Sequence, residues 1–156
     1  MKRNLSKMRN TILLISYLLI NLSACKEKDL APNNDSYFSI PDRNFEQYLV
    51  EKKIDKDGIV NGKMAKEDTR GITELLCNQK EIQSLEGIEY FVDLKYLDCY
   101  KNKLTNLDVS KNLKLTDLKC LANNLTSLDL SKNLSLTRLE CYDNQLKELN
   151  LRKNLN

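Results

Sequence analysis

The sequence predicts a repeat solenoid of mostly short parallel β-strands, preceded by a small helical N-terminal cap. The first observation is a 21-residue repeat whose copies begin at Leu94, Leu115 and Leu136. The second is a pair of LxxLx-apolar runs within each copy, since apolar residues two apart lie on one side of an extended strand. The third is a helix-like apolar spacing before the repeats. A period of this length is typical of solenoids.

The repeats read LKYLDCYKNKLTNLDVSKNLK, LTDLKCLANNLTSLDLSKNLS and LTRLECYDNQLKELNLRKNLN. Two strands per coil predict two parallel sheets with the leucines between them, and one coil alone buries too little apolar surface to fold. Asparagines recur just past the first strand, at Asn102, Asn123 and Asn144. A buried amide there can donate and accept hydrogen bonds at the turns, so we interpret them as structural ladders.

The pattern LxxLxCxxNxLxxLDLSxNxx resembles the nested, IRREKO-type leucine-rich repeat of internalin-like envelope lipoproteins from Bacteroidota. The resemblance covers residues 72–156, as four coils, and more loosely the segment before them. The first coil, residues 72–93, is one residue longer than the others and has Lys80 in place of the asparagine. The resemblance implies a leucine-rich repeat solenoid that binds a protein or a glycan at the cell surface.

Residues 1–24 predict a lipoprotein signal peptide. They have a basic start without acidic residues, and an apolar core at residues 11–20 that is too short to span a bilayer. The alternative interpretation is a membrane anchor helix. The tetrapeptide LSAC resembles the lipobox of bacterial lipoproteins, which implies that Cys25 becomes the acylated N-terminus and attaches the protein to a membrane.

Residues 25–36 predict a flexible tether, because they are polar and lack periodicity. The charged residues Lys26, Glu27, Lys28 and Asp29 resemble the signal that exports some Bacteroidota lipoproteins to the outer face of the outer membrane. A solvated linker would look much the same. We therefore expect an outer-membrane lipoprotein on the cell surface, with the periplasmic face as the open alternative.

Residues 37–71 predict the helical cap. Apolar residues fall near helical spacing at Phe45, Tyr48, Leu49 and Ile54. Pro41 and Asp42 form a helix-start signal and Gly58 a stop signal. We expect the apolar side of this helix to cover the open end of the first coil, as the cap does in the proteins that the chain resembles.

Asp55 and Asp57 suggest a calcium loop, but the spacing does not fit. An EF-hand loop counted from Asp55 needs an oxygen ligand, a glycine and a glutamate where this chain has Ile59, Val60 and Lys66. We therefore predict no metal site and interpret the segment as the turn that ends the helix.

Four cysteines recur at the inward position of the first strand, namely Cys77, Cys99, Cys120 and Cys141. An even number of cysteines in an exported chain raises the possibility of disulfides. Side chains in register on parallel strands point the same way rather than toward each other, so we interpret the four as a column of buried thiols. Zinc is disfavoured because one column offers no tetrahedral site and the chain has no histidine.

Composition disfavours several classes of function. The net charge is +3, but without Lys2, Arg3, Lys7 and Arg9 of the signal peptide 21 basic residues face 22 acidic ones, so no nucleic-acid partner is indicated. Without histidine a hydrolytic triad or a zinc-bound water is hard to build, and the acidic residues recur in columns rather than converging. We predict no enzyme activity and no cofactor.

The outward positions of the first strands predict a binding face. Tyr100, Leu121 and Tyr142 form one column beside Asp98, Lys119 and Glu140, with Tyr96 and Arg138 nearby. Aromatic columns rimmed by charge are typical of binding faces. For the column taken alone we favour the simpler interpretation, which is that these side chains support one another across the strands.

The leading hypothesis is a lipid-anchored surface protein whose repeats bind a protein or a glycan. The alternative is a truncated structural fragment without a ligand of its own. The fourth repeat ends at Asn156 with no C-terminal cap, which would expose leucines and a strand edge. Self-association at that end is therefore a further expectation.

Overall fold

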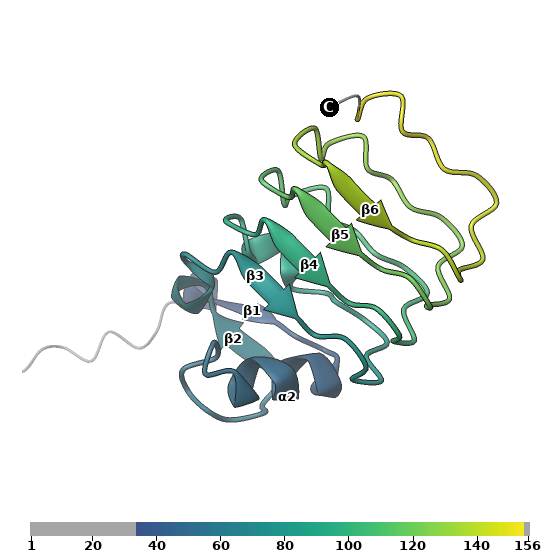
Figure 1. Ribbon diagram of the computed structural model, residues 1–156. Coiled ribbons are helices and arrows are strands. Elements are labelled where there is room, and N and C mark those ends of the chain that lie inside the picture. Colours follow the sequence, from purple (N-terminus) through teal and green to yellow (C-terminus); the bar gives the residue numbers. More distant parts are fainter. Residues whose placement is uncertain (1–33, 155–156) are drawn as a thin grey trace, which may run out of the picture. The chain divides into compact units, whose positions relative to one another are not determined.

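A computed structural model describes residues 34–154 (Figure 1). The predicted signal peptide, Cys25 and most of the predicted tether lie outside the described residues. The elements before the repeats are η1 (Asn34–Ser36), β1 (Tyr37–Ser39), α2 (Arg43–Glu51), β2 (Lys63–Ala65) and η2 (Lys66–Thr69). The repeats contain β3 (Glu74–Leu76), η3 (Ile88–Tyr90), β4 (Tyr96–Asp98), β5 (Asp117–Lys119) and β6 (Arg138–Glu140).

Strands β3, β4, β5 and β6 form one parallel sheet, with one strand from each coil (Figure 1). Leu75 pairs with Leu97, Leu97 with Leu118, and Leu118 with Leu139. The first three of these leucines are fully buried, and Leu139 packs against the same core. The predicted stacking of leucines in register is therefore confirmed, including the extra residue of the first coil.

The second run of each coil forms no strand in the described residues, so the predicted second parallel sheet is wrong. Leu104, Leu107 and Val109 still point inward and are at most 5% exposed. Asn124 N donates to Leu104 O at 2.8 Å, but no strand ladder follows along these runs in residues 34–154. Alternating burial reflects an extended backbone, and it carries no information on whether that backbone pairs with its neighbour.

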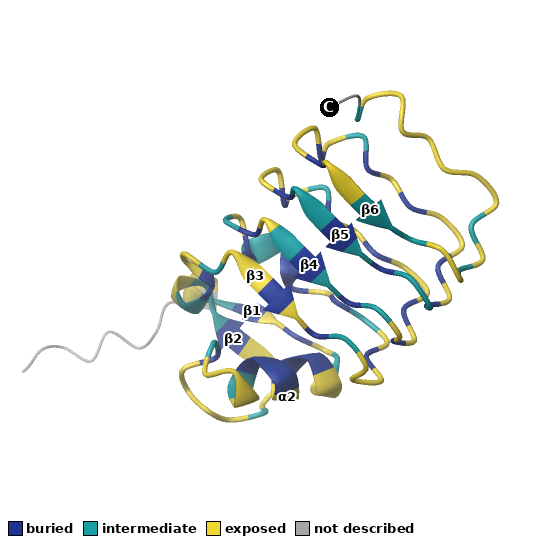
Figure 2. Cartoon of the chain, in the orientation of Figure 1, coloured by how far each residue is buried: buried dark blue, intermediate teal, exposed yellow. Residues whose placement is uncertain are grey.

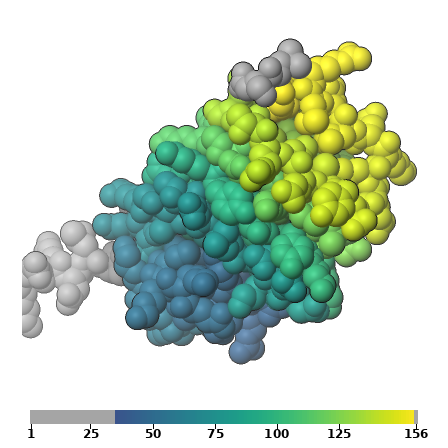
Figure 3. All heavy atoms as spheres, in the orientation of Figure 1, coloured from purple at the N-terminus to yellow at the C-terminus, as the bar shows by residue number. Residues whose placement is uncertain are grey.

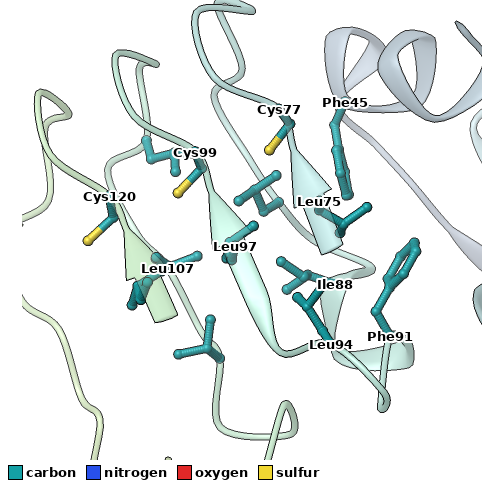
Figure 4. Packing of buried hydrophobic residues seen from close by; sticks show 14 of the residues in the cluster. Phe45, Leu75, Cys77, Ile88, Phe91, Leu94, Leu97, Cys99, Leu107 and Cys120 are labelled. Carbon is teal, nitrogen blue, oxygen red and sulfur yellow. The ribbon is translucent and has the colours of Figure 1, made fainter. Parts of the chain in front are cut away.

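The core runs through the stack between the sheet and the second runs (Figure 2). Leu94, Leu97 and Cys99 of the second coil are completely buried, as are their counterparts Leu115, Leu118 and Cys120 in the third. Figure 4 shows Leu94, Leu97 and Cys99 pointing into the interior, with Phe45 of α2 beside Leu75 at one end. Each coil thus depends on its neighbours for burial, as in other stacked repeats.

Asparagine side chains link successive coils, which confirms their interpretation as structural ladders. Asn123 Nδ2 donates to the carbonyl oxygens of Cys99 at 3.0 Å and Cys120 at 3.1 Å. Its Oδ1 accepts a bond from Leu104 N at 3.0 Å. Asn102 and Asn144 make equivalent bonds. Each amide therefore satisfies backbone groups of its own coil and of the preceding one.

A second ladder follows the second runs, at Asn112, Asn133 and Asn154. Asn133 Nδ2 donates to the carbonyl oxygens of Val109 at 2.9 Å and Asn112 at 3.0 Å. Asn112 and Asn154 repeat this pattern. Together with isolated backbone bonds such as Asn124 N to Leu104 O, these side chains join each coil to the preceding one on the side that lacks a strand ladder.

Helix α2 begins as predicted. The Asp42 carboxylate accepts hydrogen bonds from Asn44 N and Phe45 N, and its other oxygen accepts from Gln83 N at 2.7 Å in the first coil. The helix ends at Glu51, well before Gly58, and Lys53 takes the left-handed φ of 57°. Ile54 therefore lies beyond the helix, although it packs against the core.

The predicted cap segment also contains a two-stranded antiparallel sheet that the sequence analysis did not anticipate. Strand β1 pairs with β2, with Phe38 opposite Met64. Both side chains are buried, and Phe38 stacks on Tyr90 of the first coil with ring centroids 4.2 Å apart. The helix and this small sheet together contribute to the same core as the first coil.

Candidate binding face

The outer face of the parallel sheet holds all eight residues predicted for binding. Strands β4, β5 and β6 alternate, with the central leucine turned inward and its two neighbours turned out. The register gives one row of Asp98, Lys119 and Glu140 and another containing Tyr96 and Arg138. Tyr100, Leu121 and Tyr142 follow in a third row, since backbone bonds of 3.0 Å continue past the strands at Lys101 and Ala122.

The three rows cross successive coils, and these coils pack side by side in the space-filling view (Figure 3). Tyr142 is the most exposed aromatic side chain in it, at 60%. Arg138 is also exposed, whereas Tyr96, Asp98, Tyr100, Lys119 and Leu121 are half-buried. The side chains of the face are therefore partly buried on β4 and β5, and the most accessible ones lie on and just after β6.

Several face residues contact one another. Lys119 Nζ lies 3.5 Å from Glu140 Oε1. The charge of Glu140 and, after it, the Tyr96 side chain raise the pKa of Lys119 above its usual range. The Tyr100 hydroxyl accepts a hydrogen bond from Gln79 Nε2 in the first coil. Cross-strand support, the simpler interpretation of this column, therefore has direct contacts behind it.

The sequence analysis missed three members of the face. Glu74 and Leu76 of β3 lie in the same two rows as Tyr96 and Asp98, and Asp117 of β5 lies opposite Tyr96. The period-2 alternation was the signal that could have found them, because each flanks an inward leucine. Leu76 is 44% exposed, so the face extends into the first coil.

Solved structures with a similar backbone fold support this architecture. The functional domain of InlJ from Listeria monocytogenes, which includes a cysteine ladder, is 32% identical with a TM-score of 0.68. That alignment covers 76% of this chain and 26% of the InlJ chain. An internalin, InlF, from Listeria monocytogenes strain 4b F2365 is 24% identical with a TM-score of 0.62, over 70% of this chain and 32% of that one.

The fold is an internalin-like leucine-rich repeat solenoid. The chain spans about a quarter of the InlJ chain and about a third of the InlF chain. No protein family and no curated protein sequence matches the chain significantly. The in-register stacking of β3 to β6 and the similarity to these two solved structures both indicate leucine-rich repeats.

The internalin-like repeats contain a column of four free cysteines beneath the face. Cys77, Cys99 and Cys120 are fully buried, and Cys141 in the last coil is half-buried. Burial raises the pKa of Cys77 and of Cys120 to about 12 and that of Cys99 well above its usual value. These thiols therefore stay protonated at neutral pH and pack as small apolar groups, as predicted.

The Asp55 segment next to the leucine-rich repeats is a turn with an unusual carboxyl group. Asp57 accepts bonds from Ile59 N at 2.7 Å and Asn61 Nδ2 at 2.8 Å. Asp55 is 2% exposed, and neither of its side-chain oxygens accepts a hydrogen bond in the described structure. Burial, and next the charge of Asp57, raise the pKa of Asp55 to about 6. Within residues 34–154, His, Cys, Asp and Glu form no group of three that could hold a metal ion.

A hollow of about 400 Å³ lies between the second runs of the first two repeats, away from the sheet. It is lined by Leu85, Glu86, Glu89, Leu107, Asp108 and Lys111, among others. The Glu89 carboxylate accepts a hydrogen bond from Gly87 N at 2.9 Å, so this acid serves the local turn.

In the described part of the chain, no helix has the length and apolar content needed to cross a bilayer.

Proposed function

We propose that this protein is a lipid-anchored envelope protein whose internalin-like repeats bind another protein or a glycan through the outer face of the sheet. The observation that carries the proposal is the row of Tyr100, Leu121 and Tyr142 beside charged residues on one continuous surface. Aromatic side chains give large contact areas at a low entropy cost, and the neighbouring charges give direction to the contact. This is a binding module rather than an enzyme.

The N-terminal sequence supports this proposed location. Cys25 after LSA is the proposed acylation site, and the charged residues behind it favour export to the cell surface over the periplasmic face. Several acyl chains would hold the protein firmly in the outer membrane. Cys25→Ser should therefore move the protein from the membrane fraction to the soluble one. Recovery of the variant in the membrane fraction would refute lipidation, and resistance to protease on intact cells would favour the periplasmic face.

The binding face is tested at its accessible side. If the ligand is a protein, a photoreactive phenylalanine analogue at position 142 should form cross-links to an envelope protein. If the ligand is a glycan, the parent protein should bind to a glycan array, and the variant with Tyr100→Ser and Tyr142→Ser should not. Ile59, which is as exposed as Tyr142 but lies outside the sheet, provides the matched control position. Equal cross-linking from positions 142 and 59, or glycan recognition that survives both serines, would sink the proposal.

The second candidate is a structural role without a ligand. The contacts of Tyr100 with Gln79 and of Lys119 with Glu140 favour it, because they already use part of the face internally. A loss of stability in the Tyr100→Ser variant with binding unchanged would support this alternative. Self-association is a separate proposal for the β6 side, and light scattering of the Cys25→Ser chain across a concentration series would reveal it.

A further inference from the structure

The inward positions of the fourth coil are less covered than the same positions one repeat earlier. Leu128 and Leu130 of the third coil are 7% and 0% exposed, whereas Leu149 and Leu151 of the fourth are 36% and 38% exposed. Leu139 of β6 is half-buried, although the leucines aligned with it in β3, β4 and β5 are fully buried. Apolar surface gathered at one end of a stack favours contact with a further surface.

Strand β6 also directs backbone groups away from β5. It lies at one end of the sheet (Figure 1), and within residues 34–154 it pairs with β5 alone. Cys120 N donates to Glu140 O at 2.8 Å, so the residue one repeat later, Cys141, directs its N–H to the open side of β6. Backbone groups of every second residue in a strand point the same way. The N–H and carbonyl of Leu139 and the carbonyl of Thr137 therefore face that side as well.

The sequence of β6 is complementary to itself when two copies run in opposite directions. The strand reads Arg138, Leu139 and Glu140. Two antiparallel copies aligned at Leu139 place the arginine of each opposite the glutamate of the other, whereas two parallel copies in register place like charges opposite each other. Opposite charges directly across two strands stabilise the pair, and like charges destabilise it.

The antiparallel arrangement also keeps the two cores on the same side. A parallel pair of β6 edges requires rotation about the strand direction, which would place the inner side of one sheet beside the outer side of the other. An antiparallel pair requires rotation about an axis normal to the sheet. Leu139 of both copies then stays on the inner side, and the less covered Leu149 and Leu151 of the two ends face one another.

We infer that the β6 end binds a second copy of this chain, with the two β6 strands paired antiparallel about Leu139. This inference specifies the self-association proposed above for the β6 side and rests on it. Leu139 of each copy donates to and accepts from Leu139 of the other, and Cys141 N donates to Thr137 O of the other copy. The backbone groups on the open side of β6 thus have partners, as an antiparallel ladder requires.

The charged side chains fit this register. Arg138 and Glu140 direct their backbone groups to β5, so they form the pair of the antiparallel ladder that lacks hydrogen bonds, in which side chains approach most closely. Glu140 already lies 3.5 Å from Lys119 of its own chain, and a carboxylate can accept from two cations at once. Among the ion pairs of residues 34–154, none includes Arg138, so its guanidinium is available.

Pairing at β6 joins the two four-stranded sheets and leaves both outer faces on one side. Tyr142 of each copy stays on that side, because the rotation axis is normal to the sheet. A dimer of this kind presents the proposed binding face twice, and a ligand with repeated epitopes would bind both faces with increased avidity.

The test measures the mass of the 156-residue chain carrying Cys25→Ser by sedimentation equilibrium, and the parent should dimerise. Arg138→Glu places acidic side chains opposite each other, and Glu140→Arg places basic ones opposite each other. Each variant alone should dimerise at least about tenfold more weakly than the parent. An equimolar mixture of the two variants should form heterodimers, because the arginines of one meet the glutamates of the other.

The matched control is Glu74→Arg. Glu74 is exposed and lies in the same outer row as Arg138, but at the opposite edge of the sheet, so this charge reversal should leave dimerisation unchanged. Circular dichroism and thermal unfolding would confirm that each variant keeps the parent fold. A loss in Glu74→Arg equal to that in Arg138→Glu would contradict an interface at β6.

The remaining outcomes separate this inference from the proposals above. A parent that stays monomeric at every concentration would overturn both the antiparallel pairing and self-association. A parent dimer that neither charge reversal weakens, or a mixture that dimerises no better than its components, would overturn the antiparallel register alone. Ligand binding by the outer face is measured separately, so its failure would leave the mass measurement unaffected.

Discussion

The Tyr48 hydroxyl of α2 accepts a 2.7 Å hydrogen bond from the backbone nitrogen of Leu76 in β3. That amide lies on the outer edge of β3, which among the described residues pairs with no strand other than β4. An unpaired strand edge invites pairing with other chains, and a buried amide without a partner is costly. Burial raises the pKa of Tyr48 to about 12, so the hydroxyl stays neutral while it satisfies this edge.

Replacing Tyr48 with phenylalanine keeps the buried ring and removes only the acceptor. We expect the free energy of unfolding to fall by about 1 to 2 kcal/mol, because Leu76 N loses its bond. Urea denaturation measures this change. Tyr142→Phe removes an exposed hydroxyl and serves as the control, since it should leave stability unchanged. Equal stability of the Tyr48→Phe variant and the parent would show that water replaces the bond.

Asparagines of the first ladder should contribute more to the free energy of unfolding than asparagines exposed on the surface. Asn123→Ala removes bonds to Cys99 O, Cys120 O and Leu104 N, so we expect a loss of about 3 kcal/mol. The neighbouring Asn124 is exposed, and Asn124→Ala should cost less than about 0.5 kcal/mol. Denaturant midpoints of the two variants give the comparison. Similar losses at both positions would contradict the ladder's role.

The buried Asp55 carboxyl should make stability depend on pH. Its pKa in the folded protein is raised to about 6, chiefly by burial and then by the charge of Asp57, with smaller contributions from Glu46 and Asp68. A raised pKa means that folding favours the protonated form, so its contribution is present below about pH 4 and is lost as pH rises through 6. Asp55→Asn should therefore stabilise the protein by about 2 kcal/mol at pH 8.

The same variant should match the parent near pH 3.5, where Asp55 carries its proton. Thermal unfolding at both values of pH measures the difference. Asp143→Asn, at an exposed position with a φ of 52° that asparagine also tolerates, is the control and should show no such trend. A stabilisation of equal size at low and high pH would point to packing rather than ionisation.

The cysteine column should be closed to reagents in the folded state. In the Cys25→Ser chain without reductant, we expect Cys77, Cys99 and Cys120 not to react with a thiol reagent, and Cys141 to react slowly. The reason is that burial both blocks access and raises the pKa of the thiols. Unfolding should expose four reactive thiols. Mass spectrometry counts them, and fewer than four would indicate disulfides.

The repeat positions were predictable because two periods act together. The 21-residue period places Leu97, Leu118 and Leu139 in register, and the period-2 alternation decides which side chains face outward. The same two periods put Tyr100, Leu121 and Tyr142 on one face. They do not indicate that Gln79 reaches the Tyr100 hydroxyl, because that contact depends on side-chain conformation.

The elements that escaped prediction lack such periods. Strands β1 and β2 have three residues each, which is too few for alternation to be visible in the sequence. They pair with each other although α2 lies between them in the chain. The second runs alternate as predicted yet form no strand ladder in residues 34–154, since burial and backbone pairing are separate properties. The end of α2 was placed too late because Lys53, rather than a glycine, adopts the left-handed conformation.

The direction of the asparagine bonds gives the array a polarity. Asn123 and Asn133 bond to carbonyl oxygens of the coil before them, so each coil is tied to its predecessor in the chain. Tandem duplication or deletion of a whole unit would preserve these links, whereas loss of the asparagine from one unit would remove that unit's bonds to the coil before it. Such a chain can evolve a longer or shorter surface by gaining or losing whole repeats.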